Sequence, residues 1–220
     1  MTVFAAHPLD HKTTAMLASM GCRIVPADPN RPIEEQVSRL DPDFVILGDT
    51  DIESPASAAQ AMFNLIDMHV RSAAGFIKRA NEMNLSSPLE GLVIGLVGFG
   101  EVGKHLRDLA HEHLMAVAVY SSHIADEGAD AHGVRRMPDV VTLAAMSDVI
   151  AVQENLRADT VGLLKEEFFA AMKPGAILVN GSHPSVFEEN ALRSYLEGRD
   201  MRPAKMRQFN DDRMDINIPK

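Results

Sequence analysis

A glycine-rich turn between a strand and a helix says most about how this chain folds. Residues 93–103 read Val-Ile-Gly-Leu-Val-Gly-Phe-Gly-Glu-Val-Gly, so strand-forming residues run into Gly98, Gly100 and Gly103 at the spacing G-x-G-x-x-G. The first glycine permits a tight turn, the second lets the backbone approach a pyrophosphate, and the third lets the helix pack on its strand. The helix start adds N–H groups and partial positive charge. The spacing therefore predicts a dinucleotide site.

Strands and helices alternate after this turn. Parallel strands that are separated by helices of ordinary length form a doubly wound sheet through right-handed crossovers. The sequence therefore predicts a Rossmann-type α/β domain over residues 86–220. Its strands are expected at residues 93–97, 117–120, 149–152 and 176–180, and its helices at 101–113, 140–146, 165–172 and 187–196.

The first 85 residues predict a smaller N-terminal βαβαβ domain, with the functional site in the cleft between the two halves. Apolar residues recur near the 3.6-residue period from residue 56 to about 81, which predicts one long interdomain helix that residues 84–88 end. The smaller domain has expected strands at residues 3–6, 22–25 and 44–47 and expected helices at 10–20 and 32–40.

Composition excludes several classes of protein. The net charge of −10 disfavours nucleic acid or an anionic membrane as the main partner, because both need a basic face. No apolar run approaches the roughly 20 residues of a membrane span, and the first residues lack the pattern of a signal peptide, so we expect a cytoplasmic protein. The single cysteine, Cys22, excludes an intrachain disulfide and fits a small core residue.

Six short motifs follow one another in residues 85–200: Leu-Glu-Gly at 89–91, Gly-Phe-Gly-Glu-Val-Gly at 98–103, Ser-Asp-Val-Ile at 147–150, Asp-Thr-Val-Gly-Leu at 159–163, Met-Lys-Pro-Gly-Ala-Ile-Leu-Val-Asn at 172–180 and Glu-Glu-Asn-Ala-Leu at 188–192. In this order they resemble the cofactor domain of the D-isomer-specific 2-hydroxyacid dehydrogenases, and the helix at 57–71 resembles that family's interdomain helix. The resemblance implies a nicotinamide-dependent oxidoreductase that acts on a small molecule as a homodimer. S-adenosylhomocysteine hydrolase has a similar domain but matches less well.

The departures from the family pattern bear on catalysis. His183 stands where the family has its catalytic arginine, and imidazole cannot reproduce the bidentate grip of a guanidinium on a carboxylate. The family's general-acid histidine would fall beyond Lys220, so the chain resembles a shortened, divergent member. Asp49 and Asp51 follow the third expected strand, where they would repel an anionic substrate. A typical 2-hydroxy acid is therefore disfavoured.

The choice of cofactor depends on the residues after the strand at 117–120. An acidic residue normally binds the ribose 2′-OH of NAD there, but this chain has Ser121, Ser122 and His123, which favours NADP(H) and keeps NAD(H) as the alternative. His183 is the best candidate for the residue that exchanges a proton with the substrate. The alternative is that it has no catalytic role and only occupies the place of the family's arginine in this loop. The expected cofactor-binding residues are Gly98, Gly100, Glu101, Val102, Gly103, Ser121, Ser122, His123 and, beside the nicotinamide, Asn155 and Asn180.

Other polar residues have simpler interpretations. His7 and His11 could share a metal, but a loop followed by an N-cap at Asp10 explains them as well, and no metal is expected. The two histidines near the end of the helix at 101–113, His111 and His113, are interpreted as surface residues. Asp67 and Arg71, four residues apart, are expected in solvent, in a dimer contact or along the cleft.

Three functions remain open from the sequence. The leading hypothesis is an NAD(P)-dependent oxidoreductase for a non-standard carbonyl or hydroxy substrate. A catalytically inactive, dinucleotide-binding sensor or partner subunit is the main alternative, because the family's arginine and histidine have no counterparts here. The third is an enzyme that uses this fold for chemistry other than hydride transfer.

Overall fold

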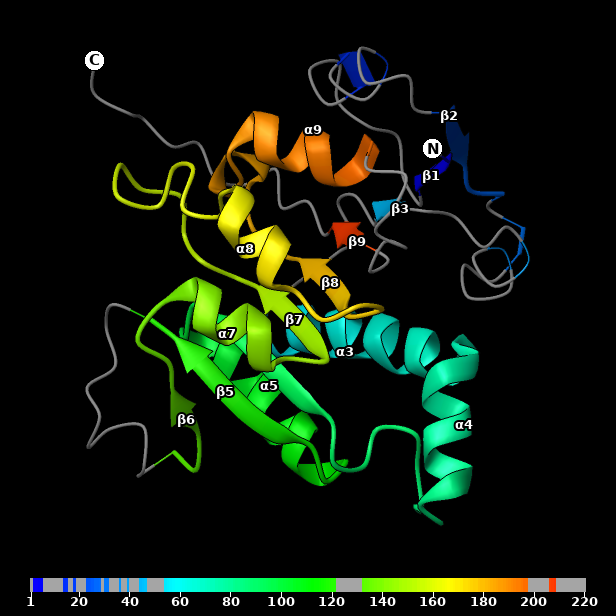
Figure 1. Cartoon of the computed structure of the whole chain (residues 1–220). Coiled ribbons are helices and arrows are strands. Elements are labelled where there is room, and N and C mark those ends of the chain that lie inside the picture. Colours follow the sequence, from blue (N-terminus) through cyan, green and yellow to red (C-terminus); the bar gives the residue numbers. More distant parts are fainter. Residues whose placement is uncertain are drawn as a thin grey trace.

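The described part of the chain contains one parallel sheet with helices on both faces (Figure 1). The computed structural model describes residues 2–5, 14–15, 18, 23–28, 30–31, 36, 39, 44–46, 54–121, 132–197 and 206–208. Within them, nine strands pair in the order β2-β1-β3-β9-β8-β7-β4-β5-β6. The strands are β1 (Thr2–Ala5), β2 (Arg23–Pro26), β3 (Phe44–Ile46), β4 (Val93–Val97), β5 (Ala116–Tyr120), β6 (Arg135–Arg136), β7 (Val149–Val152), β8 (Ile177–Asn180) and β9 (Met206–Gln208).

The six strands from β4 onward form the predicted doubly wound sheet. Counted from β4, their spatial order β6-β5-β4-β7-β8-β9 is 3-2-1-4-5-6, the order of a dinucleotide-binding sheet. The order reverses between β4 and β7, and ligands of such sheets bind outside the carboxyl ends of the strands at this point. The helices are α3 (Pro55–Ser72), α4 (Ala74–Glu82), α5 (Glu101–Glu112), α7 (Val140–Met146), α8 (Glu166–Ala171) and α9 (Glu189–Glu197), with a 3-10 turn, η1 (Pro184–Val186).

Helices fill both faces of the sheet with apolar side chains. Met62 and Ile66 of α3 join Leu106 of α5 in one buried cluster, and Leu143 of α7 joins Phe168 of α8 in the other. Among the described residues, no helix is long and apolar enough to cross a bilayer.

The N-terminal strands continue the same sheet. β3 pairs in parallel with β9, which also pairs with β8, so β2, β1 and β3 extend the sheet beyond its dinucleotide-binding half. Local sequence patterns predict each of these strands within one residue, but they contain no signal for the pairing of β3 with a segment 160 residues further on. A domain division at residue 85 stays a prediction.

The predicted long interdomain helix is wrong in one respect, because it is two helices. Ala73 is extended (φ −85°, ψ 114°) between α3 and α4, and Figure 1 shows α4 turning away from the axis of α3. The Ala73 N–H still donates to the His69 carbonyl oxygen, and α4 begins at the next residue. Since a single extended residue hardly shifts the 3.6-residue pattern, the periodicity cannot show the break.

Two of the family motifs have structural roles at the amino ends of the strands. Asp148, just before β7, accepts a hydrogen bond from the Val93 N–H at 2.9 Å and pairs with the Lys173 ammonium group at 2.9 Å. The neighbouring Ser147 hydroxyl donates to the Leu143 carbonyl at 2.7 Å. The two Asp148 contacts link the start of β4 to the segments before β7 and β8. They lie at the amino ends of the strands, opposite to the glycine-rich turn.

Gly95→Ala is expected to lower the free energy of unfolding by about 1–3 kcal/mol, the usual cost of overpacking a core. Gly95 is buried in β4, and an added Cβ would overlap the Ser147 hydroxyl and lie 2.7 Å from Leu143 Cδ2. Gly75→Ala in α4 is the control, because its Cβ would meet nothing within 4 Å and should raise stability by up to about 1 kcal/mol. Urea unfolding followed by circular dichroism measures both, and an unchanged midpoint for Gly95→Ala would contradict this packing.

Candidate functional site

Gly98 brings three segments together at the start of the glycine-rich turn. Its φ of +96° is a conformation that residues with side chains rarely adopt. Its N–H donates to the Tyr120 carbonyl oxygen at the end of β5, at 2.8 Å. An added Cβ would lie 3.1 Å from backbone atoms of Gln153 and Glu154, which follow β7. The turn and the ends of β5 and β7 therefore lie in close contact.

Gly100 leaves space for a ligand at the start of α5. It is the N-cap of the helix and, among the described residues, no side chain caps the first N–H groups and no atom lies within 4 Å of an added Cβ. Anions bind at such helix starts, where N–H groups and the helix dipole both favour negative charge. The residues present therefore fit a pyrophosphate, and the predicted cradle stays a prediction.

Gly103 packs against a residue that the sequence analysis missed. An added Cβ at Gly103 would lie 2.8 Å from the side-chain nitrogen of Gln153, and that nitrogen donates to the Gly98 carbonyl oxygen at 3.2 Å. Through this hydrogen bond and its packing against Gly103, the Gln153 side chain stabilises the glycine-rich turn. Its position directly after β7, at the point where the strand order reverses, is the only sequence signal that could have indicated it.

The other two residues of the predicted cradle differ in their surroundings. The exposed Glu101 carboxylate accepts a hydrogen bond from the Lys104 ammonium group at 2.6 Å, and this bond lowers the pKa of Glu101. The lysine charge offsets a carboxylate that would otherwise repel a phosphate at the helix start. Val102 is half-buried against the apolar cluster under α3, so only its backbone is suited to a pyrophosphate.

The adenosine end of the predicted site is described only in part. Ser121 follows β5 and is 4% exposed, beside the Tyr120 carbonyl that Gly98 contacts. Ser122 and His123 lie outside the described residues. The assignment of these three residues to the ribose stays a prediction.

Asn180 shapes the end of β8 through both atoms of its amide. It is fully buried, its Nδ2 donates to the Ser182 carbonyl at 2.8 Å, and its Oδ1 accepts from the Ser182 N–H at 3.0 Å. Asn155 is exposed on the loop after β7, where its carbonyl accepts from the Thr160 hydroxyl at 2.7 Å. Their predicted positions beside a nicotinamide stay untested.

His183 is exposed just after β8, and a backbone contact fixes its tautomer. The Ser185 N–H donates to Nδ1 at 3.1 Å, so Nδ1 is an acceptor and Nε2 carries the proton.

An added Cβ at the nearby Gly181 would lie 2.8 Å from the sulfur of Met62 in α3. α3 therefore packs closely against the segment that follows β8.

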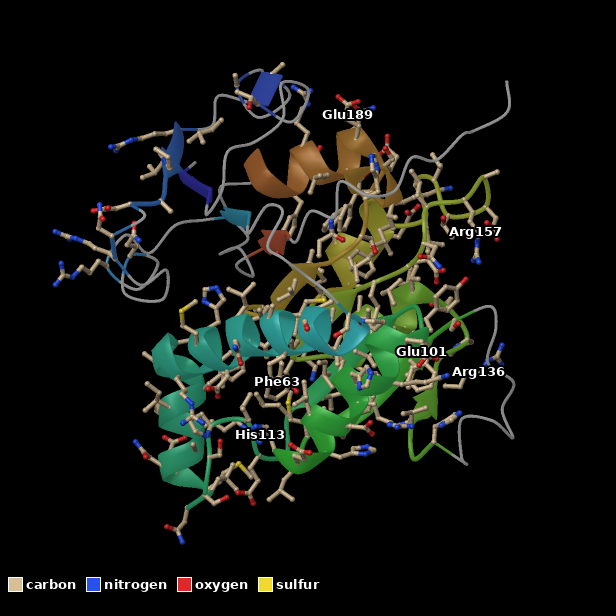
Figure 2. The ribbon with its side chains drawn as sticks, turned by 180° about the vertical axis from the view of Figure 1, so that it is seen from behind. Phe63, Glu101, His113, Arg136, Arg157 and Glu189 are labelled. Atoms are coloured by element: carbon tan, nitrogen blue, oxygen red, sulfur yellow. The ribbon has the colours of Figure 1, made fainter. Side chains whose placement is uncertain are left out.

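The remaining candidates are mostly structural. Arg71 Nε donates to both oxygens of Asp67 at 2.7 and 2.9 Å, an ion pair between successive turns of α3. His111 is exposed as predicted, but His113 is not a plain surface residue: it is half-buried and stacks on Phe63 of α3, with 4.9 Å between ring centroids (Figure 2). Periodicity along α5 alone could not show this packing. The following lie outside the described residues: His7, Asp10, His11, Cys22, Asp49 and Asp51.

Comparison with known proteins identifies the family of the chain. The family model of the D-isomer specific 2-hydroxyacid dehydrogenase NAD binding domain matches residues 56–214. D-3-phosphoglycerate dehydrogenase of Bacillus subtilis is 31% identical over 150 residues, which are 66% of this chain and 28% of that protein. Glyoxylate reductase of Thermococcus litoralis is 34% identical over 110 residues, 50% of this chain and 33% of that protein. The matched part thus spans about a third or less of these relatives.

Solved structures show the same fold at lower identity. A putative D-3-phosphoglycerate dehydrogenase from Ralstonia solanacearum superposes with a TM-score of 0.60 at 16% identity, covering 98% of this chain and 82% of that one. D-lactate dehydrogenase from Aquifex aeolicus, complexed with NAD and lactic acid, gives 0.57 at 17% identity, covering 96% and 78%. These structures share the fold, and the family model over residues 56–214 shows that the chain belongs to the D-isomer specific 2-hydroxyacid dehydrogenases.

Proposed function

We propose that this chain binds NADP(H), or less tightly NAD(H), and is an oxidoreductase for a small carbonyl or hydroxy compound. The observation that carries the proposal is the space at Gly100, which the described part of the chain leaves open at a helix start that none of its side chains caps. Gln153 and the end of β5 hold the turn around this space. Membership in the family supports the same cofactor class.

The residues of this chain divide the work between the two ends of the site. A bound dinucleotide supplies or accepts the hydride. The α5 N-terminus holds the pyrophosphate, and the Asn180 amide fixes the turn that precedes His183. His183 Nε2, which carries the proton of the neutral ring, is the group we assign to proton exchange with the substrate.

The proposed substrate is not a typical 2-hydroxy acid. His183 occupies the position of the family's carboxylate-binding arginine, and a single imidazole N–H offers one donor where a guanidinium offers a fork. Asp49 and Asp51, which the sequence places after β3, favour a neutral or cationic substrate.

Lactate, glycerate, pyruvate and glyoxylate are expected to turn over below about 1 s⁻¹, the lower end of usual enzyme rates, with either cofactor. Neutral and cationic aldehydes and ketones, assayed beside them by NADPH absorbance, should include better substrates. Turnover of one of the four acids well above this limit would contradict the substrate proposal and would mean that another residue binds the carboxylate.

A binding protein without turnover is the second candidate. His183 at the position of the family's arginine favours this second candidate. The change removes the side chain that binds the substrate carboxylate in the family. A protein that binds NADPH tightly but oxidises it with no member of the carbonyl panel would support this candidate. In either case, we propose a homodimer by analogy with the family, which light scattering of the purified protein tests.

A further inference from the structure

The loop after β7 contains a partly buried charged pair that the functions above do not use. Glu154 is only 8% exposed, and its carboxylate accepts a hydrogen bond from Arg157 Nη2 at 3.2 Å. Arg157 Nε also donates to the exposed Asp159 carboxylate at 3.3 Å. Burying a carboxylate costs free energy unless a positive charge pairs with it. The buried Glu154 carboxylate therefore favours a fixed position of the Arg157 guanidinium.

The backbone of the loop is fixed around Arg157. The Thr160 hydroxyl is buried, accepts a hydrogen bond from the Arg157 N–H at 2.7 Å and donates to the Asn155 carbonyl at 2.7 Å. The Arg157 side chain is 35% exposed, so it is held by its carboxylate partners and still reaches solvent. A positioned, partly exposed guanidinium is suited to bind an anion.

The pair lies beside the dinucleotide site. The Gly98 N–H donates to the Tyr120 carbonyl oxygen at the end of β5, and a Cβ added at Gly98 would lie 3.1 Å from the Glu154 backbone nitrogen. Glu154 therefore lies next to the glycine-rich turn and near the strand end where sheets of this kind bind the adenosine ribose. Figure 2 shows Arg157 on the same side of the molecule as Glu101, the first residue of α5. No acidic residue follows β5 directly, since Ser121 stands there.

We propose that Arg157 binds the 2′-phosphate of NADP(H) and so determines the cofactor preference. A guanidinium and a phosphate form paired, charge-assisted hydrogen bonds, and an arginine near the ribose is a known way to accept this phosphate. Glu154 and Asp159 hold the guanidinium in position when the site is empty. This inference rests on the proposed dinucleotide binding.

The experiment compares the binding of two pairs of nucleotides to variants of the full chain by calorimetry. NADPH and NADH form one pair, and adenosine 2′,5′-bisphosphate and adenosine 5′-monophosphate form the other, so each pair differs at the 2′ position. Arg157→Gln removes the guanidinium but leaves Glu154 buried without this partner. The double variant Glu154→Gln/Arg157→Gln therefore removes both charges and guards against simple unfolding, which thermal melting checks.

Both variants are expected to bind NADPH and the bisphosphate at least tenfold more weakly than the wild type, and NADH and the monophosphate less than threefold more weakly. The matched control is Arg193→Gln, because Arg193 forms an ion pair of 3.3 Å with Glu189 on α9. It should leave all four affinities unchanged.

Equal weakening of both members of a pair would overturn the inference and show that Arg157 only braces the loop. Unchanged affinities in the folded double variant would also overturn it. A wild type that binds NADH as tightly as NADPH contradicts the role of Arg157 while dinucleotide binding stands. Binding of neither dinucleotide would refute the proposed function itself.

Discussion

Gly100→Val is expected to weaken NADPH binding at least 100-fold, which corresponds to about 2.7 kcal/mol. The backbone of Gly100 (φ −80°, ψ −160°) suits a residue with a side chain, and its Cβ would enter open space. The protein should therefore fold normally, while the valine methyl groups occupy the position proposed for the pyrophosphate and cover the first N–H groups of α5. Calorimetric titration with NADPH measures the loss.

Gly100→Ala and thermal melting provide the controls for this prediction. Alanine should give a smaller loss of affinity than valine, because it fills less of the same space. Both variants should melt close to the wild type, since nothing in the described structure lies within 4 Å of the added Cβ. Wild-type NADPH affinity in a folded Gly100→Val protein would remove the pyrophosphate from this position.

His183→Ala is expected to lower kcat about 100-fold with the best carbonyl substrate, the usual contribution of a positioned acid/base group. The Ser185 N–H donates to Nδ1 and so leaves the ring proton on Nε2. The expected loss of kcat therefore reflects the removal of proton exchange at Nε2. His183→Gln should be as slow, because an amide can donate a hydrogen bond but cannot carry the proton. Steady-state kinetics with saturating NADPH measures both variants.

His111→Ala is the control for His183, since His111 is exposed in the last turn of α5. It should retain wild-type kcat. NADPH affinity should stay unchanged in both His183 variants, which separates a role in proton transfer from damage to the cofactor site. Full activity of both variants would assign the proton to water or to another side chain.

Local patterns were enough to predict four of the six described strands in the half of the sheet from β4 onward. β4, β7 and α7 begin and end at the predicted residues, because each is a short apolar or amphipathic run between clear boundaries. The three glycines of the turn differ in their surroundings: Gly98 has positive φ, Gly100 faces space that the described residues leave open, and Gly103 packs tightly against the Gln153 side chain. The first two of these properties depend on neighbours that are close in sequence or on the strand–turn–helix unit itself.

What the sequence could not predict depends on contacts between distant segments. Gln153 reaches under the glycine-rich turn from β7, and His113 stacks on Phe63 of α3. Neither pairing has a periodic pattern. The Glu154–Arg157 pair looks like surface charge in the sequence, and only the burial of Glu154 gives it meaning. β6 and β9 were missed because two or three residues are too few for an alternating pattern.

The most direct test of the central claim is a calorimetric titration of the purified, unmodified protein with NADPH and NADH. The proposed site predicts one dinucleotide per chain, with a dissociation constant in or below the micromolar range for NADPH and a higher one for NADH. Saturable binding of this kind would establish that the turn at Gly98 to Gly103 works as a dinucleotide site. No detectable binding of either dinucleotide up to about 1 mM, the upper end of usual substrate constants, would contradict the account.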